Sequence, residues 1–179
     1  PLRLVCTEEQ APLLRRHLRG GPAVEVVAEP VGRNTAAAIG LAAHHVAAKD
    51  AGTILVILPS DHWIEPAAKF QRTIVAACRF VDRHPKAFLT FGIPPTGPHT
   101  GYGYIKVERG SKNGRPVPVR QFVEKPDRVT AEQYLAAGTF YWNSGIFIAS
   151  AGTILSMIHR FLPALGRLLS LWDGLRPRR

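Results

Sequence analysis

The 179-residue sequence has little cysteine and no long apolar run, and each absence excludes a class of protein. Two cysteines, Cys6 and Cys78, are too few for a disulfide framework or a zinc site built on cysteine pairs. No apolar run approaches the roughly 20 residues of a membrane-spanning helix. Residues 1–10 also lack the basic and apolar regions of a signal peptide. We therefore expect a protein of the reducing cytoplasm that does not enter a membrane.

Acidic residues are scarce as well, with 13 Asp and Glu against 23 Lys and Arg, so the formal net charge is +10. This charge suits nucleic acid, an acidic membrane surface or small anionic ligands. The basic residues are scattered, do not alternate with aromatic residues and match no nucleic-acid-binding motif. We therefore expect no nucleic-acid partner, although a basic nucleic-acid-associated fragment remains an open alternative.

Strand-like and helix-like segments alternate along the first half of the chain. Strand patterns cover 24–28, 53–58 and 87–92, and helical patterns cover 35–49 and 66–82. Such alternation is typical of βαβ units with a parallel sheet. The run at 53–58 is apolar throughout, which predicts a strand buried on both faces. The first half therefore indicates an α/β fold.

The second half has a hairpin pattern followed by mixed elements. The elements expected are a strand at 103–108, a turn at Asn113-Gly114, a strand at 117–123, a helix at 130–137 capped by Thr130 and ended by Gly138, a strand at 141–150 and a helix at 151–161. We expect one domain over 1–165 and a basic, disordered tail over 166–179.

Residues 29–36 (EPVGRNTA) join a predicted strand to an Ala-rich helix. Asn34 or Thr35 is suited to cap that helix. The free N–H groups of a helix N-terminus attract anions, and nearby side chains can contact a nucleobase. The segment therefore predicts either a nucleotide-binding loop or a capped loop that serves only the fold.

Residues 58–62 (LPSDH) follow the apolar strand. Ligands of open α/β sheets bind beyond the carboxyl ends of the strands. Asp61 at that position is suited to Mg²⁺, which prefers carboxylate oxygens and commonly keeps substrate phosphates as further ligands. The alternative is that Asp61 only caps a turn.

Residues 122–126 (FVEKP) and 142–145 (WNSG) suggest a site for a sugar phosphate. Phe122 indicates the end of a buried strand, and Pro126 favours an extended Lys125 on the face opposite Glu124. The pair is therefore predicted to contact a ligand instead of forming a salt bridge: a carboxylate accepts hydrogen bonds from hydroxyls and an ammonium holds a phosphate. The alternative is a solvated strand end. Upstream, the glycines of 101–103 (GYG) allow a ligand to approach the backbone.

In this order, the segments 29–36, 58–64, 91–105, 122–127 and 142–147 resemble the sugar-1-phosphate nucleotidyltransferases, and within them the mannose-1-phosphate guanylyltransferases. The resemblance implies a Rossmann-like nucleotide-diphospho-sugar transferase fold, with a mixed, mostly parallel sheet flanked by helices. It also implies that GTP and α-D-mannose 1-phosphate are converted to GDP-mannose and diphosphate, with Mg²⁺ as the cofactor.

The resemblance further implies roles for individual residues. The residues expected beside guanine and ribose are Glu29, Arg33, Asn34 and Thr35. Those expected at the sugar phosphate are Gly103, Glu124, Lys125 and Asn143. Asp61 is the expected metal ligand, and Asp61 and Lys125 are the expected catalytic residues.

Two parts of the family pattern have no equivalent in the sequence: the Gly-x-Gly-x-Arg loop and a second metal-binding Asp. We therefore expect a domain truncated at both ends, inactive or weak as it stands, with a homodimer as a further expectation for the full-length protein. Two alternatives stay open: a non-catalytic sugar-phosphate-binding module derived from this family, and a nucleotidyltransferase for another hexose 1-phosphate.

Overall fold

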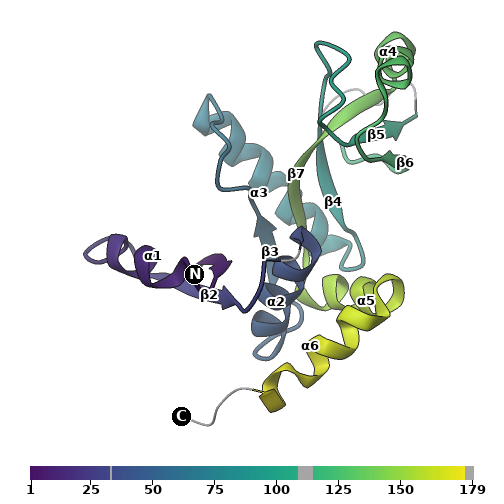
Figure 1. Cartoon of the computed structure of the whole chain (residues 1–179). Coiled ribbons are helices and arrows are strands. Elements are labelled where there is room, and N and C mark those ends of the chain that lie inside the picture. The colour runs from purple at the N-terminus through teal and green to yellow at the C-terminus, as the bar shows by residue number, and fades with distance from the viewer. Residues whose placement is uncertain (33, 109–114, 176–179) are drawn as a thin grey trace. The chain divides into compact units, whose positions relative to one another are not determined.

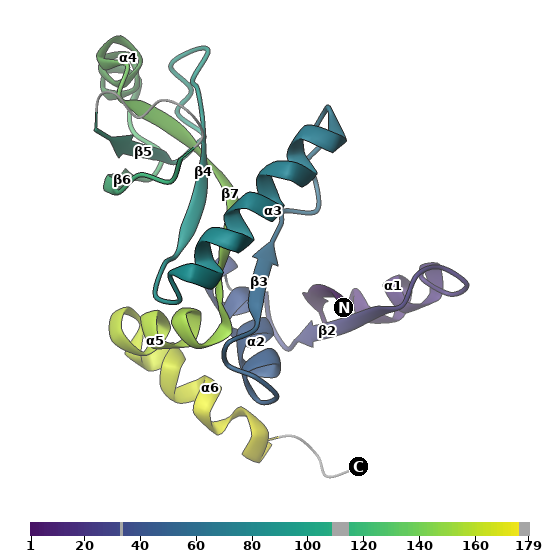
Figure 2. The same cartoon turned by 180° about the vertical axis from the view of Figure 1, so that it is seen from behind.

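The structure is a computed structural model that describes residues 1–32, 34–108 and 115–175. Figures 1 and 2 show its elements from opposite sides. In chain order they are β1 (Leu2–Thr7), α1 (Ala11–His17), β2 (Val24–Glu29), α2 (Thr35–Ala47), β3 (Ile54–Ile57), α3 (Ala67–Arg83), β4 (Leu89–Ile93), β5 (Tyr104–Val107), β6 (Val119–Val123), α4 (Arg128–Ala137), β7 (Phe140–Ser150), α5 (Ala151–Phe161) and α6 (Pro163–Leu175).

The chain divides into two compact units. The first contains Pro1–Leu55, Pro85–Ala87 and the chain from Ala149 onward, and the second contains Val56–His84 and Phe88–Ile148. In the first unit, β1 and β2 pair in parallel, and α2 packs against α5 and α6. Small residues allow this approach: a Cβ on Gly40 of α2 would lie 2.8 Å from Ile158 Cδ1 and 2.9 Å from Leu169 Cδ1.

Most of a five-stranded sheet lies in the second unit. The strand order is β3-β7-β5-β6, and β4 also pairs with β7. Helix α4 packs on this sheet through aromatic residues, because the Tyr134 ring stacks on the Phe140 ring with 3.8 Å between centroids. Tyr104, Ala131 and Phe140 are buried in the same cluster. The long strand β7 pairs with β3, β4 and β5.

The prediction of an α/β protein with helices flanking its sheets is confirmed. Parallel pairs were expected to predominate, but they do not among the strand pairs whose residue-by-residue register is defined. Strands β1 and β2 are parallel, whereas the pairs β4–β7, β5–β6 and β5–β7 are antiparallel. For the pair β5–β6 the reason is that the two strands are consecutive in the chain, and a short connection joins only antiparallel strands.

The apolar run at 53–58 forms β3, but the prediction that it is buried on both faces is wrong. Val56 is 37% exposed and Leu58 is 51% exposed. Strand β3 stands at the end of the strand order, so the described chain gives it one neighbouring strand. Apolar composition therefore predicted the strand correctly but not its position in the sheet.

Two predicted boundaries also change. The cap of α4 is Asp127, whose Oδ1 accepts a 2.7 Å hydrogen bond from the Thr130 backbone N–H, so the predicted cap at Thr130 is wrong. The predicted end of this helix at Gly138 is confirmed by a left-handed φ of 63°. The disordered tail predicted for 166–179 is instead helical as far as Leu175. Residues 176–179 and the turn at Asn113-Gly114 lie outside the described residues, and the single domain over 1–165 stays a prediction.

None of the helices in the described ranges combines the length and the apolar character that crossing a bilayer requires.

Candidate functional site

Three of the predicted sugar-phosphate-binding residues are neighbours across strands. Strand β5 pairs with β6 on one edge and with β7 on the other. Continuing both registers by one residue places Gly103 between Glu124 and Asn143, and the Asn143 backbone N–H donates to the Gly103 carbonyl at 2.7 Å. Cross-strand neighbours direct their side chains to the same face. We call Glu124, Gly103 and Asn143 the cross-strand row.

Gly103, at the centre of the row, is buried and has no room for a side chain. A Cβ at this position would lie 2.8 Å from Glu124 Oε2 and 3.0 Å from Phe122 Cζ. The glycine thus leaves space for the Glu124 carboxylate next to the backbone. A larger residue would have to displace that carboxylate, so the position of Glu124 depends on Gly103.

Asn143 has a partner that the sequence did not indicate. The Thr90 hydroxyl of β4 donates to Asn143 Oδ1 at 2.8 Å, although 53 residues separate the two positions. With its oxygen engaged, the Asn143 amide presents its NH₂ group as a donor. Thr90 therefore fixes the orientation of the amide. No local pattern marks such a residue, because only the pairing of β4 with β7 brings it into reach.

The backbone at Lys125 differs from the prediction. An extended conformation was expected before Pro126, but Lys125 has φ 44°, in the left-handed region. Its Nζ lies 3.9 Å from Glu124 Oε1, so the two residues form an ion pair, which the prediction had favoured less than two ligand contacts. The physical reason is a sharp change of direction: Pro126 is buried, and α4 begins at Arg128. Left-handed backbone at a non-glycine residue is strained, and such strain is common at functional sites.

The Glu124–Lys125 ion pair leaves both groups accessible to a ligand. The two side chains are 59% and 65% exposed, and exposed ion pairs contribute little stability. The end of β6 is exposed as well, because Phe122 is 52% exposed. The predicted buried strand end is therefore wrong, since β6 is the last strand in the sheet order. The Lys125 ammonium can therefore leave the Glu124 carboxylate and bind a phosphate with little loss of free energy.

Asp61 lies in an exposed turn after β3. This turn is next to the end of the 142–145 segment, because a Cβ on Gly145 would lie 3.4 Å from Pro59 Cγ. Gly145 has φ 71°, a conformation that glycine adopts without strain. Within the described ranges no three His, Cys, Asp or Glu side chains form a metal-binding group. Asp61 thus offers a single carboxylate, beside the strand that carries Asn143.

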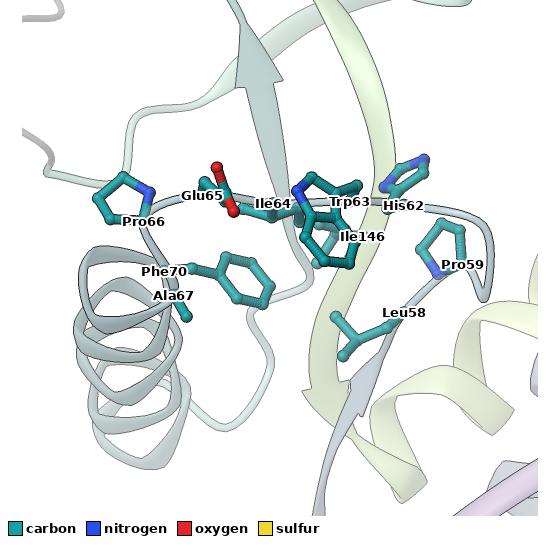
Figure 3. A pocket seen from close by; sticks show the side chains of 10 residues that line it. All are labelled: Leu58, Pro59, His62, Trp63, Ile64, Glu65, Pro66, Ala67, Phe70 and Ile146. Atoms are coloured by element: carbon teal, nitrogen blue, oxygen red, sulfur yellow. The ribbon is translucent and has the colours of Figure 1, made fainter.

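The same loop lines a cavity of about 590 Å³. Figure 3 shows its lining side chains, which come from the loop, from the start of α3 and from β7: Leu58, Pro59, His62, Trp63, Ile64, Glu65, Pro66, Ala67, Phe70 and Ile146. Most of these side chains are apolar, and the ionisable ones are His62 and Glu65. The cavity therefore suits apolar groups and not phosphates.

The predicted nucleotide-binding residues belong to the first unit. Glu29 ends β2, opposite Thr7 of β1, and its carbonyl accepts a 2.9 Å hydrogen bond from the Glu8 backbone N–H. Asn34 caps α2, with its Oδ1 accepting from the Thr35 N–H at 2.8 Å, so the predicted cap is confirmed. Asn34 and Thr35 are exposed. Arg33 lies outside the described residues.

The structure therefore groups the predicted site residues in two sets. Gly103, Glu124, Lys125 and Asn143 lie together in the second unit, and the loop of Asp61 reaches their strand through Pro59 and Gly145. Glu29 lies at the end of β2, and Asn34 and Thr35 lie at the start of α2, all in the first unit. The roles of these residues stay predictions.

Known proteins resemble this chain over most of its length. Residues 2–167 match the nucleotidyl transferase family. The "Xanthan biosynthesis protein XanB" of Xanthomonas campestris pv. campestris (strain B100) is 42% identical over 150 residues, which are 83% of this chain and 31% of that protein. The "Mannose-1-phosphate guanylyltransferase" of Klebsiella pneumoniae is 40% identical over 164 residues, 89% of this chain and 34% of that protein.

A solved structure has the same fold. The crystal structure of "mannose-1-phosphate geranyltransferase" from Thermus thermophilus superposes with a TM-score of 0.84 at 26% sequence identity, and covers 98% of this chain and 50% of that chain. This chain thus spans about a third of the length of the curated relatives and half of the solved one. Because the family match extends over nearly the whole chain, the chain belongs to the nucleotidyl transferase family.

Proposed function

We propose that the intact protein is a mannose-1-phosphate guanylyltransferase, which makes GDP-mannose and diphosphate from GTP and α-D-mannose 1-phosphate. The observation that carries the proposal is the cross-strand row of Glu124, Gly103 and Asn143, with Lys125 beside it. The family of the chain and its 40% identity to a protein described as a mannose-1-phosphate guanylyltransferase support this choice of substrates.

The row supplies the groups that a sugar phosphate requires. The Glu124 carboxylate accepts hydrogen bonds from sugar hydroxyls, and the Asn143 amide donates one. Gly103 lets the Glu124 carboxylate lie against the backbone, because a Cβ at this position would be 2.8 Å from Glu124 Oε2. The exposed Lys125 ammonium holds the phosphate as a point charge. Together these groups bind the acceptor sugar and fix the direction of its phosphate.

The start of α2 is proposed to hold the nucleotide. The side chains of Glu29, Arg33, Asn34 and Thr35 suit a guanine nucleotide, and the N-terminal end of the helix favours its phosphates. A phosphate oxygen of mannose 1-phosphate attacks the α-phosphorus of GTP, forming the new P–O bond. The bond between the α-phosphorus and the oxygen bridging to the β-phosphate breaks, and diphosphate leaves. The attacking oxygen is already anionic, so the protein contributes positioning and charge stabilisation instead of a covalent nucleophile.

Asp61 is the residue proposed to hold Mg²⁺. A single exposed carboxylate fits this ion, which is commonly bound by one or two carboxylates together with substrate phosphates. When bound, Mg²⁺ neutralises charge on the triphosphate and on the leaving diphosphate. Asp61 would fix its place beside the strand that carries Asn143. A cytoplasmic location and a homodimer of the full-length protein belong to the same proposal.

The proposal is tested by assaying GDP-mannose formation with the full-length protein and with this 179-residue chain side by side. We expect Mg²⁺-dependent turnover of GTP and mannose 1-phosphate by the full-length protein. Preference for another nucleotide or another hexose 1-phosphate would overturn the assignment. Calorimetric binding of mannose 1-phosphate without turnover by the full-length protein would identify a sugar-phosphate-binding module instead.

A further inference from the structure

We infer that the second unit has an additional ligand site, a groove between α3 and the sheet that binds a nucleoside diphosphate. The groove encloses about 640 Å³, a volume within the range of small-molecule sites. Figure 2 shows α3 crossing the face of β4 and β7 that forms one wall. The groove shares no lining residue with the cavity in Figure 3, which is lined by the loop after β3.

The charge of the groove points to an anion. Four cationic side chains line it, Lys69, Arg72, Arg83 and Arg115, and no carboxylate is among its lining residues. Across the described ranges, the ion pairs with carboxylates involve other cations, namely Arg3, Arg120, Lys125 and Arg128. Cationic groups gathered without carboxylates attract phosphates. A phosphorylated ligand therefore suits the groove better than a neutral or cationic one.

The cations come from one face of α3 and from the segment before β6. Lys69 and Arg72 are one turn apart on α3, so they lie on the same side of the helix. Arg83 follows at the other end of the helix, about 16 Å further along the axis from Arg72 at a rise of 1.5 Å per residue. Arg115 lines the groove from the segment before β6. Lys69 and Arg72 are close enough to hold the two phosphates of one diphosphate, whereas Arg83 is too far along the helix to share them.

The remaining surface of the groove suits a planar, apolar body. Phe80 of α3 and Tyr141 of β7 are aromatic, and Ile105 and Val119 add apolar area from the sheet. Aromatic side chains stack on nucleobases whatever the base. Inorganic diphosphate has no group to occupy this part of the groove. The combination of cations with aromatic and apolar walls therefore points to a nucleoside diphosphate, free or as its sugar ester.

The groove adjoins the cross-strand row through one residue. Thr90 lines the groove, and its hydroxyl donates to Asn143 Oδ1 at 2.8 Å. A ligand of the groove is thus a neighbour of the proposed sugar site without sharing Glu124 or Lys125. An experiment can therefore separate the two sites by mutation.

The test is calorimetry of GDP binding in the presence of EDTA. The background is the 179-residue chain with Arg33→Ala and Lys125→Ala, which removes two groups of the proposed transferase site. We expect saturable binding of one GDP per chain, weakened about tenfold or more by Arg72→Glu. The matched control is Lys49→Glu, which makes the same change of charge at an exposed residue that does not line the groove. This control is expected to bind GDP as the background does.

A steric pair of variants checks the same site without changing charge. Ala76→Trp places an indole in the groove from an exposed position of α3, and Ala68→Trp makes the same change outside it. We expect loss of GDP binding with Ala76→Trp alone, and unchanged circular dichroism for both. GDP-mannose in place of GDP distinguishes the sugar ester from the free nucleotide, and either one binding supports the site.

Three outcomes would overturn the inference: no saturable binding of either GDP or GDP-mannose to the background chain, equal weakening by Lys49→Glu, or inorganic diphosphate binding as tightly as the nucleotide. The first would show that no nucleotide site exists here, the second that bulk charge attracts GDP, and the third that no base is recognised. The test involves no turnover, so its failure does not affect the proposed transferase activity, and failure of that activity does not affect the test.

Discussion

The start of α2 and the cross-strand row present predicted ligand-binding groups in two different ways. At the start of α2, adjacent residues make the structure: Asn34 Oδ1 accepts from the next residue's N–H at 2.8 Å. In the row, Gly103 and Asn143 join through a 2.7 Å backbone hydrogen bond between different strands. The first arrangement depends on the local chain, and the second depends on strand register.

This difference predicts different responses to mutation. A change at the start of α2 removes one hydrogen bond and leaves its neighbours in place. A change in the row affects residues distant in sequence, because a side chain added at one strand displaces a side chain from the next. In the row, function is therefore expected to be more sensitive to mutation than stability.

The largest expected effect comes from Asp61, whose loop borders the strand of the row. Asp61→Ala in the full-length protein should lower Mg²⁺-dependent turnover by about three orders of magnitude, because the proposed metal loses its carboxylate ligand. The measurement is the rate of GDP-mannose formation across a Mg²⁺ titration. Asp82→Ala, at an exposed position of α3, is the matched control and should leave the rate unchanged. Near-normal turnover of Asp61→Ala would refute the metal assignment.

Gly103→Ala tests the row itself. The new Cβ would lie 2.8 Å from Glu124 Oε2, and the end of this flexible side chain can move away. We expect kcat/KM for mannose 1-phosphate to fall by about one to two orders of magnitude, with a loss of unfolding free energy of about 1 kcal/mol or less. Steady-state kinetics and urea unfolding measure the two effects. Gly101→Ala, where a Cβ would meet nothing within 4 Å, should leave both unchanged.

Gly145→Ala and Gly138→Ala compare two left-handed glycines, with φ 71° and 63°. Each substitution should lower the unfolding free energy by about 1 kcal/mol, because alanine is strained in this region. Only Gly145→Ala should also impair turnover, since its Cβ would lie 3.4 Å from Pro59 Cγ in the loop of Asp61, whereas a Cβ on Gly138 would meet nothing within 4 Å. Urea unfolding together with the transferase assay compares them. Equal effects on turnover would show that Gly145 has no role in positioning the site.

The smallest expected effect is on stability in acid, and it distinguishes the α4 cap Asp127 from the α2 cap Asn34. The backbone N–H and the hydroxyl of Thr130 hold the pKa of Asp127 below the usual aspartate range. Its contribution to stability is therefore present above about pH 4, the usual value for an unfolded aspartate, and is lost as pH falls through the lower folded pKa. The neutral amide of Asn34 does not titrate in this range.

An NMR titration in acid measures this difference. The Thr130 amide proton should shift with a midpoint below about pH 4, and the Thr35 amide proton should not shift in that transition. Asn34→Asp is the converse variant, and it should give the Thr35 amide a similar acid transition. A Thr130 amide that does not respond to acid would contradict the role of Asp127 as the cap.

Sequence patterns predicted helices and strands well, but they predicted burial and the conformation of connecting residues poorly. The helix over 151–161 agrees in both bounds with α5, because its spacing and its cap are local properties. The burial of β3 was predicted wrongly, since an apolar run does not reveal whether a strand is central or at an edge. The conformation of Lys125 was also missed, because the turn into α4 and the burial of Pro126 outweigh the usual preference before proline.

The order of residues along the chain was enough to specify the motifs around Asp61, Glu124 and Asn143 and the cap at the start of α2, where Asn34 Oδ1 accepts from the Thr35 N–H. Which of these groups meet depended on the folded sheet. Folding placed Gly103 between Glu124 and Asn143, and it brought the Thr90 hydroxyl to Asn143 across 53 residues. Caps depend on atoms a few bonds apart along the chain, whereas the row depends on hydrogen-bonded register between distant strands, which residue spacing does not specify.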